Sequence, residues 1–190
     1  MAINYKICPY CNSKDVVKIV YGYPSGDMIM QEAAGKVKLG GCLIDIEYSP
    51  EYHCNNCENQ WDKEEAIEHA YGEIKGLNFS HGGYFQGFQE LKIDFKLKRI
   101  EYTHSLEDRG TLIKDTSKAD LFEFIETLKN IDFLNWRSKY VDPDVLDGSG
   151  WDIEIVRDGR NLKKHGLNSY PDSWEDFLIA LERLSGMEIR

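Results

Sequence analysis

The sequence predicts an α+β protein, with a small β-rich module followed by an antiparallel sheet that carries helices on one face. Three observations predict this class. Two C-x-x-C motifs, Cys8 to Cys11 and Cys54 to Cys57, bracket short β-branched stretches near the N-terminus. Several later segments alternate apolar and polar residues, which is typical of half-buried strands. Two further segments have apolar residues three and four positions apart, as in helices that cover a sheet.

Length and composition set the domain organisation. The chain has 190 residues, of which 42% are hydrophobic and 12% aromatic, so it can bury packed cores. This length suits one large domain or two small ones. We expect the β-rich module over residues 1–61, a linking helix over residues 62–76, and the α+β domain over residues 77–190.

The charge balance excludes some partners. The formal net charge is −10, with 33 acidic against 23 basic residues, so binding to a nucleic-acid backbone is not expected. Lys92, Lys96, Lys98 and Arg99 lie close together, but their alternation with apolar residues is typical of a solvated strand face. The sequence has no run apolar enough to span a membrane, and no secretory signal pattern precedes Cys8. Cysteines kept reduced favour the cytoplasm.

Short elements are expected between the two cysteine motifs. A helix over residues 28–34 is predicted, with Asp27 as its N-cap and Gly35 at its end. β-branched residues and alternation predict strands over residues 3–7, 16–21, 36–39 and 43–48. Although 42 residues separate Cys11 from Cys54, antiparallel pairing of such strands can bring the two motifs together.

The two motifs have the local geometry of a metal site. Each C-x-x-C pair folds a tight turn that aims two thiolates at one ion, and four thiolates complete a tetrahedron. We therefore expect one structural Zn²⁺ held by Cys8, Cys11, Cys54 and Cys57, with no open position for catalysis. The alternative, four unrelated buried cysteines, does not account for two independent pairs. Cys42 is expected to be a small buried core residue, and His53 is not expected to be a ligand.

This pattern resembles the zinc ribbon, in which two such turns lie on β-hairpins and an aromatic residue follows the second. It is similar in detail to bacterial zinc-ribbon proteins of uncharacterised function. The shared motifs are C-P-Y-C at 8–11, Y-G-Y-P at 21–24, G-G-C at 40–42, and C-x-x-C at 54–57 with Trp61. The resemblance covers the first third of the chain, and it implies a metal site without implying an activity.

The rest of the chain predicts strands and helices in turn. A helix over residues 62–75 should begin with a capping box formed by Asp62 and Glu65. Two further helices are expected, one capped by Thr116 or Ser117 and one by Asp172 or Ser173. Alternation predicts strands over residues 79–85, 91–102, 151–155 and 161–166, with polar or irregular connections over 103–116 and 133–147.

The last two helices share a spacing that suggests an internal repeat. Leu121, Phe124, Ile125 and Leu128 match Trp174, Phe177, Leu178 and Leu181. A duplicated ββα unit would give a four-stranded antiparallel sheet with both helices on one face. The alternative is that amphipathic helices commonly share this spacing.

A second resemblance lies near the C-terminus. Residues 136–185 are similar to an uncharacterised bacterial domain with a D-G-x-x-W motif, an alternating strand, and G-x-N-x-Y-P before a final helix. Asp147-Gly148, Trp151, Gly166 to Pro171 and Trp174 carry this likeness. It supports the fold and implies no activity.

Function is less well specified than fold. His81, His104 and His165 are accompanied by no nucleophile motif, phosphate loop or second metal pattern, so we do not expect an enzyme. The first hypothesis is a non-catalytic protein that binds another, basic protein, as an immunity protein or antitoxin does. The alternatives are an enzyme with its site on the uncovered sheet face, and nucleic-acid binding through the zinc ribbon. The aromatic residues Tyr84, Phe85, Trp136, Tyr140, Trp151, Tyr170 and Trp174 suit either a core or a recognition surface.

Overall fold

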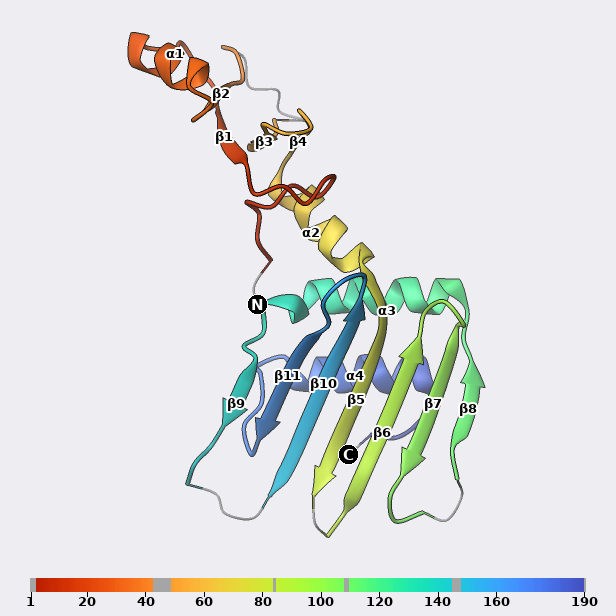
Figure 1. The fold of residues 1–190 in the computed structure, drawn as a ribbon. Coiled ribbons are helices and arrows are strands. Elements are labelled where there is room, and N and C mark those ends of the chain that lie inside the picture. Colours follow the sequence, from red (N-terminus) through yellow and green to blue (C-terminus); the bar gives the residue numbers. More distant parts are fainter. Residues whose placement is uncertain (1–2, 43–48, 84, 108–109, 145–147, 190) are drawn as a thin grey trace. The chain divides into compact units, whose positions relative to one another are not determined.

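The computed structural model describes residues 3–42, 49–83, 85–107, 110–144 and 148–189. It divides into two compact units, one over Ile3–Gly72 and one from Glu73 onward. Each unit has its own sheet, the first of four strands and the second of seven (Figure 1). The α+β class is confirmed.

The first unit has a mixed sheet in the order β2-β1-β3-β4. Its strands are β1 (Val16–Val20), β2 (Lys38–Leu39), β3 (Tyr52–Cys54) and β4 (Gln60–Trp61). β1 is antiparallel to β3, and β3 to β4. β2 is parallel to β1, because the chain between them passes through helix α1 (Gly26–Ala33) and returns in the same direction.

Local hydrogen bonds decide how the elements of this unit begin. Helix α1 is capped by Ser25, whose hydroxyl accepts from the Met28 N–H, so the predicted Asp27 cap is wrong. The expected strand over residues 3–7 is a turn, closed by a bond from the Ile7 N–H to the Asn4 carbonyl. The strand expected over residues 43–48 lies outside the described residues.

Helix α2 (Lys63–Gly72) begins as predicted. The Glu65 N–H donates to Asp62 Oδ1 at 2.8 Å, and the Asp62 N–H donates to Glu65 Oε2 at 3.1 Å. These reciprocal bonds form the capping box and satisfy two backbone donors that the first helical turn leaves unpaired.

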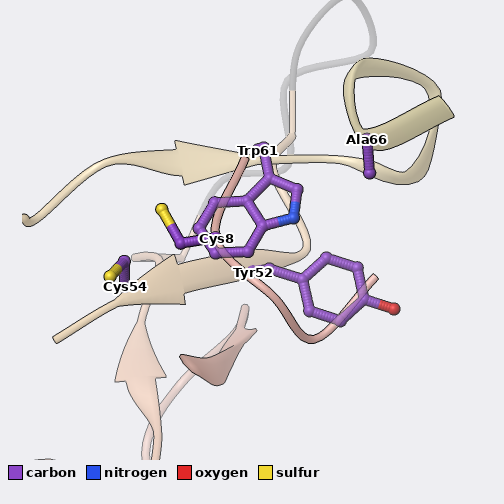
Figure 2. Close-up of a cluster of buried hydrophobic side chains, with 5 residues drawn as sticks. All are labelled: Cys8, Tyr52, Cys54, Trp61 and Ala66. Carbon is purple, nitrogen blue, oxygen red and sulfur yellow. The ribbon is translucent and has the colours of Figure 1, made fainter. Parts of the chain in front are cut away.

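A small hydrophobic cluster fills the interior of the first unit. It consists of Cys8, Tyr52, Cys54, Trp61 and Ala66 (Figure 2). The Trp61 ring stacks on Tyr52 with 5.9 Å between ring centroids, and its indole N–H donates to the Tyr5 carbonyl. Two of the cluster's members are the first cysteines of the two C-x-x-C motifs, so packing and the candidate metal ligands share one place.

The second unit is built on a seven-stranded sheet in the order β8-β7-β6-β5-β10-β11-β9. The strands are β5 (Ile74–Gly83), β6 (Gly87–Asp94), β7 (Arg99–His104), β8 (Leu112–Asp115), β9 (Lys139–Val141), β10 (Ser149–Arg157) and β11 (Leu162–Leu167). Neighbours are antiparallel except β11 and β9, which are parallel. The sheet is therefore mixed, where a wholly antiparallel one was expected.

The single long strand expected over residues 91–102 is two strands, β6 and β7, joined by a tight turn. Asp94 Oδ1 accepts from the Leu97 N–H at 2.8 Å, and Lys98 has a left-handed φ of 53°. The sequence keeps alternating through this turn, which hides it. Leu97, which alternation would place in the core, is 63% exposed.

Two edge strands occupy stretches that were expected to be loop or irregular. All four residues of β8 are exposed, and only the middle residue of β9 is buried. Backbone hydrogen bonds to β7 and β11 hold these two strands in the sheet. Their sequences therefore lack the alternation of apolar and polar residues that marks a half-buried strand. Consequently helix α3 (Lys118–Asn130) follows four strands and α4 (Trp174–Ser185) follows three, and the four-stranded sheet of a duplicated ββα unit is not formed.

Helices α3 and α4 cover the same face of this sheet (Figure 1). Ser117 caps α3 with a capping box to Asp120, one of the two predicted caps. The core between the sheet and the helices centres on Trp174, which is 5% exposed and packs against Trp151 with ring centroids 4.8 Å apart. The short 3-10 helix η1 (Phe133–Asn135) adds Phe133, stacked on Phe177.

Most of the seven aromatic residues that were considered for a core or a recognition surface belong to this core. Trp136, Tyr140, Trp151 and Trp174 are buried, and Tyr170 is partly buried against Trp174. Phe85 differs, being 86% exposed, and Tyr84 lies outside the described residues. The core interpretation therefore holds for the four buried rings.

Candidate metal centre and sheet groove

The first C-x-x-C motif folds as a knuckle closed by two backbone hydrogen bonds. The Asn12 N–H donates to the Cys8 carbonyl, and the Cys8 N–H donates to the Ser13 carbonyl, both at 2.9 Å. Asn12 has a φ of 58°, a left-handed conformation that Asn adopts more readily than most residues. The chain thus reverses just after Cys11.

The second motif repeats this geometry at the same spacing. The Glu58 N–H donates to the Cys54 carbonyl at 2.9 Å, and the Cys54 N–H donates to the Asn59 carbonyl at 3.0 Å. Glu58 has a φ of 62°, matching Asn12. This second knuckle is the turn of the β3–β4 hairpin, and the two motifs are therefore locally equivalent.

Pairing of β1 with β3 brings the two knuckles together. Val16 lies opposite Cys54 in the antiparallel register. The Asn55 N–H donates to the Asp15 carbonyl at 2.9 Å, and the Asn55 amide donates to the Asp15 carboxylate at 2.9 Å. These contacts fix one knuckle against the other across 42 intervening residues.

The four predicted ligands meet in one cluster. The sulfur atoms of Cys8, Cys11, Cys54 and Cys57 all lie within 4.8 Å of one another. The Cys8–Cys57 and Cys11–Cys54 sulfur pairs are 3.5 and 3.6 Å apart. A tetrahedron with metal–sulfur bonds of ~2.3 Å has sulfur atoms ~3.8 Å apart. The cluster therefore has the dimensions of a four-thiolate metal site.

The cluster's surroundings act differently on its members. Burial raises the pKa of the Cys8 thiol to about 12. Hydrogen bonds from the backbone and side-chain amides of Asn59 lower the pKa of Cys57 to about 6, and the Asn59 amide lies 3.4 Å from its sulfur. The Asn56 amide lies 3.7 Å from the Cys11 sulfur. Amide donors favour thiolates, but four thiolates this close together need a cation to offset their charge.

Two nearby residues lie outside the cluster. Cys42 is exposed, so the prediction of a buried core residue is wrong. Gly40 and Gly41 precede it, and a bond from the Gly22 N–H to the Gly41 carbonyl holds this stretch at the surface. His53 is buried, which lowers its pKa, but it does not join the four-sulfur group.

The three histidines of the second unit do not lie on one face of its sheet, since His104 is in register with Gln89, the cross-strand neighbour of His81, whereas His165 is not in this row. His81 is buried on the helix-covered face, with its ring 5.7 Å from that of Trp174. His165 is exposed on the opposite face, where it pairs across the strands with Asp152. Among the described residues, the four cysteines are the only group of three or more potential ligands in metal-binding range.

Sequence reasoning missed a buried lysine. Lys164 is 1% exposed, and its ammonium group donates to the carbonyls of Trp136 at 2.6 Å and Leu134 at 3.1 Å. Burial lowers its pKa to about 8. The sequence did contain a signal for this burial: strand alternation in β11 places Lys164 on the same face as Gly166, which is the face toward the core. Lys164 thereby joins β11 to the segment around η1.

The uncovered face of the second sheet carries a groove of about 510 Å³. Its charged lining consists of Glu90, Lys92, Glu101, Asp152, Glu154 and Lys163. Ser80, Thr103 and Asn78 add uncharged polar groups, and no histidine lines it. Charged and polar side chains therefore line the groove beside the apolar residues Phe79, Leu91 and Ile153, and carboxylates outnumber lysines four to two.

No protein-family model and no curated protein matches the chain. In the part of the chain that the structure describes, none of the helices is both long enough and apolar enough to traverse a lipid bilayer. Two features of the molecule therefore bear on its function: the cluster of four cysteines, and the groove with a surplus of carboxylates on an open sheet.

Proposed function

We propose that the Ile3–Gly72 unit binds one structural Zn²⁺ through Cys8, Cys11, Cys54 and Cys57. The observation that supports this is the meeting of four sulfur atoms within 4.8 Å on two equivalent knuckles. Thiolate ligands in tetrahedral geometry are preferred by zinc over calcium or magnesium. Four protein ligands also leave no coordination position for a substrate, so the ion has a structural role.

Metal analysis tests this part of the proposal. Protein purified under reducing conditions should contain one zinc per chain by elemental mass spectrometry. Cobalt substitution should give the visible absorption of a tetrahedral thiolate complex, which octahedral oxygen sites lack. Iron in place of zinc, or less than one ion per two chains after zinc loading, would contradict the assignment.

We further propose that the protein is non-catalytic and acts by binding a basic protein, in the manner of an immunity protein or antitoxin. The net charge of −10 supports this, since complementary charge steers association and disfavours acidic partners. The groove gives further support, because it offers a surplus of carboxylates on an open surface to a cationic partner.

Nucleic-acid binding through the zinc ribbon has less support. Of the four lysines that could form a basic stripe there, Lys38 lies 3.9 Å from the Glu32 carboxylate. Lys14, Lys18 and Lys36 are exposed but belong to a chain whose acids exceed its bases by ten. Phosphate binding requires a local positive field, which this balance opposes.

Affinity capture tests the interaction. The full chain, immobilised with and without zinc, is exposed to native lysate, and bound proteins are identified by mass spectrometry. Each captured protein is then purified and titrated by calorimetry. A stoichiometric complex with a basic protein supports the proposal. Capture of acidic proteins alone, or of none that bind when purified, contradicts it.

A further inference from the structure

The uncovered face of the second sheet presents its polar side chains in two rows that run across the strands. Strand register sets both rows. The first row contains His165, Asp152, Ser80, Glu90 and Thr103, from β11, β10, β5, β6 and β7. The second row contains Lys163, Glu154, Asn78, Lys92 and Glu101 from the same strands. Most of these residues line the groove.

The second row is matched in charge. Lys163 lies 3.4 Å from the Glu154 carboxylate, which also accepts from the amides of Asn78 and Asn161. These hydrogen bonds, with a smaller contribution from Lys163, lower the pKa of Glu154. Lys92 lies directly opposite Glu101. Two lysines therefore face two glutamates in this row.

The first row has a surplus of negative charge. Asp152 and Glu90 are the cross-strand neighbours of Ser80, one on each side. Within the described residues, neither carboxylate forms a side-chain hydrogen bond or ion pair. The nearest base in sequence to Glu90 is Lys92, which belongs to the second row. The groove as a whole keeps two unmatched carboxylates.

The surplus of negative charge determines which ligands can bind in the groove. A ligand that displaces water from a carboxylate must return hydrogen bonds, because an unpaired buried charge is costly. Cationic donors return the strongest ones. Neighbouring strands are ~4.8 Å apart, so the Asp152 and Glu90 backbones, two strands apart, are separated by roughly 10 Å. A fitting ligand therefore carries two cationic groups at about that spacing.

We propose that this groove is the docking surface for a basic protein segment, with lysine or arginine side chains on Asp152 and Glu90. The inference rests on the proposed function, the binding of a basic protein, and adds where that protein binds. A groove of about 510 Å³ accommodates a few side chains. Ser80 and Thr103 lie in the same row and supply hydroxyl groups for further hydrogen bonds.

The test uses a fluorescein-labelled decalysine peptide, titrated with the full zinc-loaded chain and followed by fluorescence anisotropy. The groove variant combines Asp152→Asn with Glu90→Gln. The matched control combines Asp144→Asn with Asp172→Asn, two exposed residues that do not line the groove and remove the same charge. We expect the groove variant to bind the peptide at least about tenfold more weakly, and the control to stay within about threefold of wild type.

Amide resonances of isotope-labelled protein add a second readout, since the peptide should shift those of β5, β6 and β10. Equal weakening by both variants, or no binding of the peptide to wild type, overturns the inference. Binding of a single-stranded oligonucleotide in place of the peptide also overturns it. All four substituted side chains are exposed, and circular dichroism should confirm that both variants keep the fold.

The same variants separate this inference from the proposed function. A protein captured by wild type and lost by the groove variant supports both. A captured basic protein that the groove variant binds with unchanged affinity leaves the proposed function standing and overturns the docking surface. Failure of wild type to capture any basic protein contradicts the proposed function itself.

Discussion

The two units of the chain bury very different interiors. The Ile3–Gly72 unit has a hydrophobic cluster of Cys8, Tyr52, Cys54, Trp61 and Ala66, in which two members are candidate metal ligands. The unit from Glu73 onward packs one face of a seven-stranded sheet against two helices through a network of aromatic rings. The interior of the first unit is therefore centred on candidate metal ligands, whereas the interior of the second is a large apolar core.

This difference has a thermodynamic consequence. Small domains bury a low fraction of their surface and commonly depend on metals or disulfides for stability. The free energy of metal binding is then also free energy of folding. We therefore expect the first unit to respond to metal and to its cysteines, and the second to respond to the loss of core volume.

Metal removal should produce the largest effect. Chelation, or Cys11→Ser, should unfold Ile3–Gly72, because structural zinc contributes on the order of 10 kcal/mol to such modules. Hydrogen exchange measured by mass spectrometry should show loss of protection there, with β5 to α4 unchanged. Cys42→Ser is the matched control, since Cys42 is exposed and outside the cluster, and it should keep one zinc per chain. Protection of the first unit that survives chelation would remove the distinction between the units.

Truncating the central tryptophan of the second unit should reverse this pattern. Trp174→Ala removes a ring in contact with Phe79, Trp151 and Phe177, and should lower the free energy of unfolding by about 3–5 kcal/mol. Zinc content should not change. Phe122→Ala is the control, because Phe122 is a 66% exposed aromatic residue on α3 and its loss should cost less than about 0.5 kcal/mol. Similar losses from both variants in denaturant titrations would contradict the core described here.

The buried lysine gives a smaller effect in the same unit. Lys164→Met keeps the aliphatic stem but removes the donor to the Leu134 and Trp136 carbonyls. Removing a hydrogen-bonding partner from buried groups costs about 1–3 kcal/mol. Its neighbour Lys163 has a 75% exposed side chain on the opposite face, so Lys163→Met should be nearly neutral in thermal unfolding. Equal stability of the two variants would show that the Lys164 contacts do not hold η1.

The pH dependence of stability should carry a signature of Lys164. Burial lowers its pKa from 10.5 to about 8 in the folded state. Between these values the unfolded chain binds a proton that the folded chain has released, so stability contributed by this group rises with pH. We expect the stability difference between wild type and Lys164→Met to grow by about 1.3 kcal/mol from pH 7 to pH 9. A difference that stays constant over this range would place the folded pKa near its usual value.

The sequence predicted structural features well where they depend only on residues a few positions apart. The capping boxes at Asp62 and Ser117 depend on residues three positions apart; the first was predicted as a capping box, and Ser117 was one of two predicted caps. The buried stripe of α4 follows helical spacing and was also predicted. The Asp94–Lys98 turn was missed because its residues continue the strand alternation, and the turn is made by one side-chain hydrogen bond and one left-handed residue.

The sequence carries no signal for features that depend on contacts with a distant segment of the chain. β8 exposes all its side chains and exists through backbone bonds to β7, which leave no trace in hydrophobic pattern. The surface position of Cys42 likewise depends on a bond between Gly22 and Gly41, distant in sequence. Burial of Lys164 depends on carbonyls about 30 residues away in the chain.

The sequence alone was enough to identify the four cysteines as the candidate ligands of one metal ion, because ligand type and C-x-x-C spacing follow from the chemistry of that ion. It also determined the helix start at Asp62, narrowed the cap of α3 to Thr116 or Ser117, and determined the acidic balance of the chain. Only the tertiary structure decided that the sheet has seven strands and that Asp152 and Glu90 flank Ser80 on its uncovered face. The physical reason is register: cross-strand neighbours are set by backbone hydrogen bonds between distant segments, whereas knuckles and caps are set within a few residues.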